Sequence, residues 1–234
     1  MKPTKKTEKE YYRALKKVAK HAAHIVDVHA DGAVVTFPAK MMAELEKYAT
    51  MLEPWANRTA AKMIAATKAS VDRTMKAQSR EIAITLKQQI NSTPMGVATR
   101  AIQSAQVDLI QSIPLEAGVR AQKLALSAFT EGKRPSVVAA EIARTQEVTE
   151  SRAMLIARTE TAKAASIVTE VRAKEVGVTH YIWRTAGDSD VRESHAEMEG
   201  EVCAYDDPPI VDGEPLNPGM IYNCRCYAEP IITD

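Results

Sequence analysis

The sequence predicts a mainly α-helical protein that ends in a small, loop-rich α+β module. Apolar residues make up 45% of the 234 residues, but only two Phe and two Trp are among them. Such a composition favours helices with small side chains at their contacts over a β-sandwich. Apolar positions recur at helical spacing as far as residue 176, whereas residues 200–234 contain five prolines and three glycines and show little periodicity.

The helices are predicted from apolar spacing and from the residues that start and stop a helix. Asp31-Gly32 ends the first, and the prolines fit first turns of later ones. Apolar positions repeat every eleven residues from Ile64 to Leu86, which predicts one long helix with a narrow apolar stripe. Gly177 is expected at the C′ position of the last helix. The predicted helices are 11–29, a segment beginning at Pro38, 54–91, 94–112, 114–130, 135–146 and 149–176, followed by a strand over 179–185 and a short helical stretch over 191–198.

Charge divides the chain into two predicted domains. Residues 1–177 hold 28 Lys and Arg against 18 Asp and Glu, a net charge of +10. Residues 178–234 hold 3 against 12, a net charge of −9. We therefore expect a basic helical body, 1–177, and an acidic C-terminal module, 178–234. The charge of the body suits an acidic protein surface or nucleic acid, although a set of solvated helix faces would also explain it.

Targeting signals and cysteine usage restrict the class of protein further. No run approaches the roughly 18–20 apolar residues needed to cross a bilayer, so no membrane partner is expected. The Lys-rich start is not followed by an apolar signal-peptide core, which argues against secretion by that route. An odd number of cysteines, three, argues against a disulfide framework and favours metal binding or plain thiols.

The three cysteines and one histidine lie close together in the sequence and predict a zinc site. His195, Cys203, Cys224 and Cys226 supply the four nitrogen and sulfur donors that structural zinc prefers. Scattered aliphatic residues cannot offset roughly 1–2 kcal/mol of backbone entropy for each ordered residue in 200–234. A structural zinc contributes on the order of 10 kcal/mol, and docking on the helices is the other source of stability. Three reduced, partly buried thiols are the alternative interpretation.

Catalysis is not expected. Asp188, Asp190 and His195 could form an acid/base set with Ser194 or Cys203 as nucleophile. However, the sequence contains no Gly-x-Ser-x-Gly elbow, no His-Glu-x-x-His and no phosphate loop. We therefore predict no catalytic residues and no cofactor other than zinc.

Several short motifs then occur in order along the chain. They are Ile156-Ala-Arg-Thr-Glu160, Trp183, Asp188-Ser-Asp-Val-Arg-Glu-Ser-His195, Gly200, Pro218-Gly219 and Asn223-Cys-Arg-Cys226. Over roughly residues 135–232 the chain thereby resembles the phage Mu F-like family of head morphogenesis, or minor head, proteins. Residues 1–130 carry no motif of this family. By motif position, the family's signature residues correspond to Asp188, Arg192, His195, Gly200, Cys224, Arg225 and Cys226.

The resemblance implies a minor head protein of a tailed phage, present in several copies per head. Its expected partners are the portal protein, the major capsid protein and packaged DNA, and its expected place is the head interior near the portal, after assembly in the host cytoplasm. Because Cys203 stands where the family commonly has an aromatic residue, Asp188 is the alternative fourth zinc ligand. Arg192 and Arg225 are expected to donate to Asp188 or neighbouring carboxylates. Two alternatives stay open: a metal-dependent hydrolase or toxin-related effector, and an independent DNA-binding helical protein.

Overall fold

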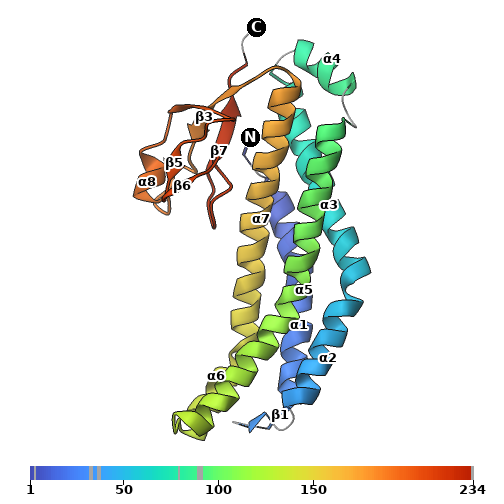
Figure 1. Ribbon diagram of the computed structural model, residues 1–234, viewed down its shortest axis with the longest axis vertical. Helices are drawn as coiled ribbons and strands as arrows, with labels where there is room; N and C mark the ends of the chain where they lie inside the picture. The colour runs from blue at the N-terminus through green and yellow to red at the C-terminus, as the bar shows by residue number, and fades with distance from the viewer. Residues whose placement is uncertain (3, 32–33, 36–37, 79, 89–91, 233–234) are drawn as a thin grey trace. The chain divides into compact units, whose positions relative to one another are not determined.

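The computed structural model describes residues 1–2, 4–31, 34–35, 38–78, 80–88 and 92–232 (Figure 1). It is 69% helical with a few small strands in the C-terminal region, which confirms the predicted fold class. The helices are α1 (Lys5–Val28), α2 (Pro38–Met51), α3 (Glu53–Lys76), α4 (Arg80–Gln88), α5 (Thr93–Thr130), α6 (Pro135–Ala143), α7 (Thr145–Glu175) and α8 (Glu193–Ala196).

The strands form three small antiparallel sheets. They are β1 (Ala30–Asp31), β2 (Val34–Val35), β3 (His180–Arg184), β4 (Val202–Ala204), β5 (Ile210–Val211), β6 (Glu214–Pro215) and β7 (Tyr227–Pro230). The largest sheet has the order β4-β3-β7, and the pairs β1-β2 and β5-β6 form two-stranded ribbons.

The chain forms two compact units, and α1, α3, α5 and α7 each contribute a segment to both. The first unit contains residues 1–9, 61–103 and 158–234, and the second contains 10–60 and 104–157. Residues 178–234 thus cluster with the second half of α7. The division at residue 177, which rests on charge, stays a prediction.

The second unit is held by a core of small and aliphatic side chains, as the composition predicts. Its fully buried members include Val26, Met41, Leu45 and Ala121. Gly118 on α5 allows a close helix contact, because a Cβ there would lie 2.6 Å from a methyl carbon of Leu45. Ala-rich helices therefore pack closely with few large residues.

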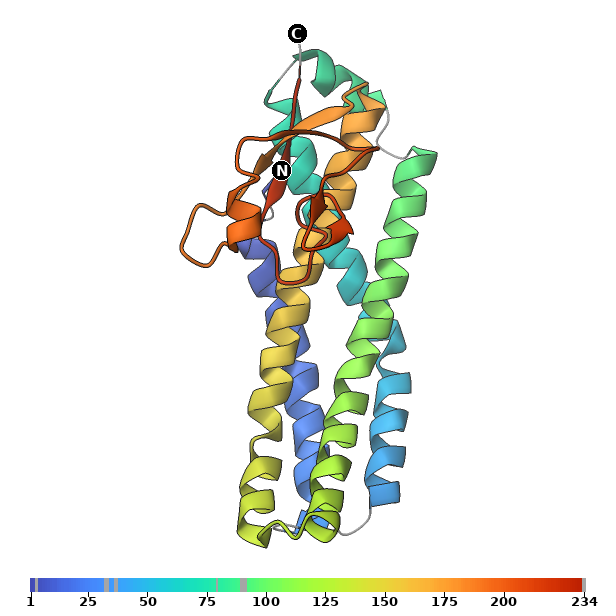
Figure 2. The same ribbon diagram turned by 60° about the vertical axis from the view of Figure 1, so that its left-hand side comes forward.

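The end of α7 has the geometry that the sequence predicts at Gly177. This glycine has a φ of 79°. Its N–H donates to the Lys174 carbonyl over 3.1 Å, and the Val178 N–H donates to the Ala173 carbonyl over 2.9 Å. These two bonds define a Schellman motif. The motif ends the helix and leads the chain into β3 (Figures 1 and 2).

The sheet β4-β3-β7 carries the core of residues 178–232. Along β3 the side chains alternate, and Tyr181 and Trp183 are both fully buried. Tyr181 pairs with Cys203 on β4, and Trp183 pairs with Ala228 on β7. Because β3 is the central strand, its two aromatic residues form the middle of this core.

The C-terminal module makes several polar contacts with α7. Docking on the helices was the second source of stability expected from the sequence, beside a metal ion. Lys174 donates to Asp206 over 2.6 Å, and Asn217 donates to Glu170 over 3.3 Å. The backbone N–H of Asn223 donates to Thr159 over 3.2 Å. The loops after β4 are thus fixed along the second half of α7.

Two helix boundaries predicted from the sequence are wrong. Helix 54–91 is interrupted, because α3 ends at Lys76 and Ala77 and Gln78 form a turn. Ala and Gln are good helix formers, so the sequence does not signal this break. The apolar stripe itself is confirmed: Ile64, Val71, Met75, Ile82 and Leu86 are all buried. Residues 79 and 89–91 of that prediction, and Gly32 of the predicted stop after the first helix, lie outside the described residues.

Helices 94–112 and 114–130 are in fact one helix, α5, with Pro114 inside it. A proline inside a helix removes one backbone hydrogen bond and costs about 3 kcal/mol or more. The adjacent side chains Ile110 and Ile113 are fully buried. Burial of the α5 face that carries these two residues offsets the cost of the proline. Local sequence rules do not predict this effect, because it depends on tertiary packing.

Among the described residues, the helices include none that is both long enough and apolar enough to cross a membrane.

Candidate metal centre

A tight β-hairpin places the first important side chain of the site, Asp212. Val211 on β5 pairs with Glu214 on β6, which leaves the two-residue turn Asp212-Gly213 between the strands. Both turn residues have positive φ, 56° at Asp212 and 87° at Gly213. This is the pattern of a type I′ turn, for which Asp-Gly is a preferred sequence.

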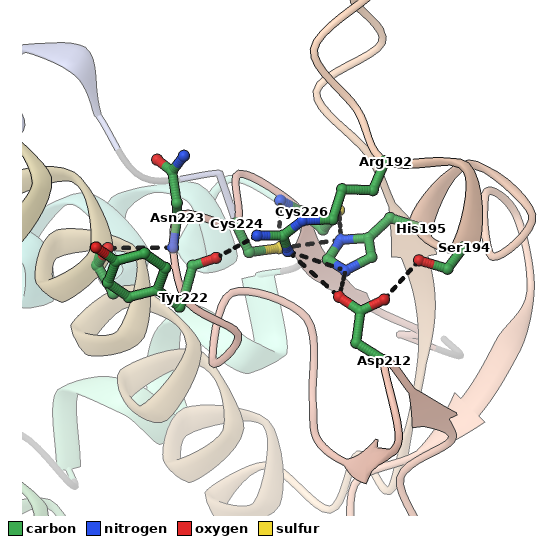
Figure 3. A network of polar contacts seen from close by, with 9 residues as sticks. Arg192, Ser194, His195, Asp212, Tyr222, Asn223, Cys224 and Cys226 are labelled. Carbon is green, nitrogen blue, oxygen red and sulfur yellow. Dashed lines mark hydrogen bonds and ion pairs between the residues drawn. The ribbon is translucent and has the colours of Figure 1, made fainter.

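The turn directs the Asp212 carboxylate toward His195 on the short helix α8 (Figure 3). Oδ2 of Asp212 lies 3.1 Å from Nε2 of His195, and His195 is only 2% exposed. The Ser194 hydroxyl donates to Oδ1 of the same carboxylate over 2.7 Å. Asp212 therefore fixes the orientation of a buried imidazole, and its own pKa is lowered by the hydrogen bonds from Ser194 and His195.

A tight turn brings the two cysteines to the other nitrogen of the imidazole. The Cys224 N–H donates to the Ile221 carbonyl over 3.1 Å, and Asn223 has a φ of 54°. Asn is one of the few residues other than Gly that adopts this conformation readily. Cys224 and Cys226 are both 3% exposed, so their thiols face the interior of the module.

His195, Cys224 and Cys226 present ligand atoms that all lie within 4.8 Å of one another. Nδ1 of His195 is 3.5 Å from the sulfur of Cys224 and 3.5 Å from that of Cys226. In a tetrahedral zinc site, metal–nitrogen and metal–sulfur bonds of the usual lengths separate these donors by about 3.6 Å. The two nitrogen–sulfur separations therefore match those of a tetrahedral zinc site.

Hydrogen-bond donors surround the two sulfur atoms. The Cys226 backbone N–H donates to the Cys224 sulfur over 3.3 Å, and the Gly219 N–H also donates to it. The buried indole N–H of Trp183 has no hydrogen-bond partner among the described residues, and it lowers the pKa of Cys226. Such N–H groups stabilise thiolates, which are the form in which cysteine binds a metal.

The protonation of the two thiols is coupled. The hydrogen bond from the Cys226 thiol, with the backbone N–H groups and His195, lowers the pKa of Cys224 to about 5. The same bond to Cys224, together with burial, raises the pKa of Cys226 well above its usual range. Without a metal the pair thus shares one proton at neutral pH.

Two arginines flank the centre, as the sequence predicts for fork donors. Arg225 makes a bidentate pair with Asp188, with both N–O distances 2.6 Å, and lowers the pKa of that carboxyl. Arg192 lies 3.4 Å from Asp212 and donates to the Tyr222 carbonyl over 2.9 Å. Arg192 and Arg225 both line a cavity that His195 also lines.

Three of the four predicted zinc ligands are brought together, and the fourth is not. Cys203 lies on β4, where its thiol is 3.9 Å from the Glu201 carbonyl oxygen and burial raises its pKa. The alternative fourth ligand, Asp188, is occupied by Arg225. Among the described residues, neither belongs to the group formed by His195 and the two other cysteines.

Asp212, Trp183 and Gly219 are parts of this site that were not predicted from the sequence. For Asp212 a signal existed, because Val211-Asp-Gly-Glu214 has the form of a two-residue hairpin turn. Trp183 and Gly219 belong to the motifs shared with the phage Mu F-like family, but a motif does not reveal the direction in which an N–H group points.

The fold and this centre define a class: a helical protein whose C-terminal module is organised around an imidazole and two thiols. Residues 120–229 match the family model described as Phage Mu protein F like protein. This match includes the whole centre and supports the phage Mu F-like family for this part of the chain.

A curated protein of Haemophilus influenzae (strain ATCC 51907 / DSM 11121 / KW20 / Rd), described as an uncharacterized protein, is 34% identical over 142 residues. The aligned region is 61% of this chain and 31% of that protein, so the chain spans about a third of the length of its relative. No solved structure matches the chain significantly.

Proposed function

We propose that the chain is a minor head protein of a tailed phage, a virion component that binds the portal protein and the inner capsid during head assembly. The observation that carries this proposal is the match of residues 120–229 to the phage Mu F-like family. In this proposal the chain has no catalytic activity. It lies in the head near the portal, in several copies, after assembly in the host cytoplasm.

The proposal includes one zinc ion per chain, bound by His195, Cys224 and Cys226. Support comes from the 3.5 Å separations between Nδ1 and the two sulfurs and from the N–H groups that face the sulfurs. When bound, zinc joins α8 to the turn around Asn223 and so stabilises the module. The chain's own residues orient the imidazole and hold the thiolates.

The basic residues of α1 are the proposed contact with acidic partners. Arg13, Lys17 and Lys20 are exposed and lie three or four residues apart, so they share one face of the helix. A basic face of this kind binds acidic protein surfaces and, with a strong dependence on salt, the phosphates of DNA.

Co-purification tests the head function. The full chain is co-expressed with the cognate portal protein and, separately, with the major capsid protein, and each complex is isolated through a tag on the partner. We expect the chain to be retained by the portal protein. The triple variant R13E/K17E/K20E should weaken retention at least about tenfold, because it reverses the charge of the α1 face.

The matched control is K47E/R58E/K123E, which makes the same change in net charge at exposed positions elsewhere in the second unit. Retention of this control at the wild-type level would show that the α1 face is specific. No retention of the wild-type chain by either partner would contradict the proposal. Salt-sensitive duplex binding without any partner binding would favour the independent DNA-binding protein instead.

A metal-dependent hydrolase is the second candidate, because a cavity adjoins the three donors. Its test is turnover of activated ester and phosphodiester model substrates by the zinc-loaded chain. Turnover that is lost in Cys226→Ser would favour an enzyme over the assembly role.

A further inference from the structure

The donors available to a metal are fewer than zinc prefers. Structural zinc is almost always held by four protein ligands, whereas catalytic zinc has three and keeps one position for an exchangeable ligand. Among the described His, Cys, Asp and Glu residues, the group at this centre has three members, His195, Cys224 and Cys226. The number of protein donors therefore equals that of a metal site with one exchangeable ligand.

A cavity adjoins the three donors. Its volume is about 60 Å³, and its lining includes the three donors together with Arg192, Arg225 and Asp190. A water molecule needs at least about 10–15 Å³ of such space. The cavity therefore has room for a water molecule or a small anion beside the metal position.

Charge in the cavity suits an anionic ligand. Two thiolates neutralise a divalent ion, so an anion as fourth ligand would leave one negative charge. Arg192 lies with Nη1 3.5 Å from Nε2 of His195, and Arg225 is fixed by Asp188. Arg192 and Arg225 both line the cavity. Asp212 and Asp188 already pair with them, but each guanidinium has five N–H donors and can also donate to an anion in the cavity.

We infer that the metal of this centre has a fourth, exchangeable position, which opens into the cavity between Arg192 and Arg225 and takes water or a small monodentate anion. The inference rests on the proposed metal site. It differs from that proposal in one respect: the fourth donor is not a side chain of this protein. A carboxylate from a binding partner would enter by the same route.

Cobalt substitution tests the inference with the full chain. Co²⁺ replaces zinc, and its visible d–d bands report the coordination geometry, while thiolate charge-transfer bands in the near ultraviolet confirm binding to cysteine. Sodium azide is then titrated at constant ionic strength. We expect tetrahedral cobalt bands that shift in a saturable manner, and an azide affinity at least about tenfold lower in Arg192→Gln.

Two variants test whether a side chain of this protein acts as the fourth metal ligand. Asp190 is exposed and lies 3.4 Å from Arg225, so its carboxylate could turn inward, and Cys203 was the fourth ligand expected from the sequence. Cys203→Ser should keep the wild-type spectrum and the wild-type azide response. Asp190→Asn should keep the wild-type spectrum and bind azide at least as tightly as the wild type, because it removes a negative charge from the cavity lining. Either variant gaining an azide response that the wild type lacks would overturn the inference and identify the closing ligand.

Different results overturn the exchangeable position and the metal site. Tetrahedral, thiolate-bound cobalt that does not respond to azide in any variant means four fixed donors, which overturns the exchangeable position and leaves the metal site intact. Failure of the chain to bind cobalt or zinc overturns the metal site itself, and the inference with it.

Discussion

Nε2 of His195 lies 3.1 Å from Oδ2 of Asp212, seventeen residues further along the chain. A carboxylate in this position accepts the Nε2 proton and leaves the lone pair of Nδ1 directed at the sulfurs of Cys224 and Cys226. Histidines that bind metals are oriented in this way by an outer carboxylate. The Asp212-Gly213 turn thus determines which nitrogen of His195 is available.

Asp212→Asn tests this relationship. Asn tolerates the positive φ of the position, so the turn is retained while the charge is lost. Loss of an outer-shell partner typically weakens metal binding by about 10–100-fold, and we expect a loss in this range. Competition with a chromophoric zinc chelator measures it.

The control for this variant is Asp206→Asn, which removes an equal charge at a site that contacts Lys174. Its zinc affinity should stay within about twofold of the wild type, since surface ion pairs contribute little. Equal affinities of Asp212→Asn and the wild type would show that Asp212 does not orient His195.

Zinc binding should release about one thiol proton at pH 8. The pKa of Cys224 is lowered to about 5, so this thiol is ionised before the metal arrives, whereas the raised pKa of Cys226 keeps that proton in place. Calorimetric titration in buffers of different ionisation enthalpy counts the protons released.

The sign of the pH dependence follows from the same values. As the pH falls toward 5, Cys224 also begins to bind a proton, so zinc binding must release more protons and its affinity falls faster with acid. Release of two protons at pH 8 would contradict the lowered pKa of Cys224.

Gly219→Ala should destabilise the module more than Gly187→Ala. Both glycines have positive φ, 89° and 75°, a conformation that costs an L-residue roughly 1–2 kcal/mol. At Gly219 a Cβ would also lie 3.2 Å from the Cys226 carbonyl oxygen, whereas nothing lies within 4 Å of one at Gly187. Urea unfolding of the two variants measures the difference in the free energy of unfolding, and equal values would contradict the tight packing at Gly219.

Arg172→Met should destabilise the first unit by about 3–5 kcal/mol. Arg172 is fully buried and pairs with Asp72 over 2.8 Å and with Glu175 over 2.7 Å. Without the guanidinium, two carboxylates of low exposure lose their counter-charge. Lys174→Met is the control, because Lys174 is partly exposed and its ion pairs should contribute no more than about 1 kcal/mol. A loss of less than 1 kcal/mol for Arg172→Met would show that water replaces the guanidinium.

The sequence predicted the parts of the fold that local chemistry determines. Gly177 ends α7 because its positive φ is specific to a helix C-terminus, and the eleven-residue stripe is buried as expected. Pro114 was misjudged, because burial of α5 offsets the cost of a proline inside a helix. The break after Lys76 falls at residues with good helix propensity, so local rules did not find it.

The site shows the same division between local and long-range information. His195, Cys224 and Cys226 were found because their side chains are typical zinc ligands. Asp212 is one of 12 acidic residues in 178–234, and its role depends on a hairpin that brings it back to α8. The expected fourth ligand, Cys203, is directed by the register of β4 against β3, which the spacing of cysteines does not encode.

The zinc content of the full chain tests the central claim most directly. The wild type and the variants His195→Ala, Cys226→Ser and Cys203→Ser are purified without added metal, and each is analysed by native mass spectrometry and elemental analysis. We predict one zinc per chain in the wild type and in Cys203→Ser, and less than about a tenth of that in the other two variants. A folded wild-type chain without any bound metal, or loss of zinc in Cys203→Ser equal to that in Cys226→Ser, would contradict the three-donor centre.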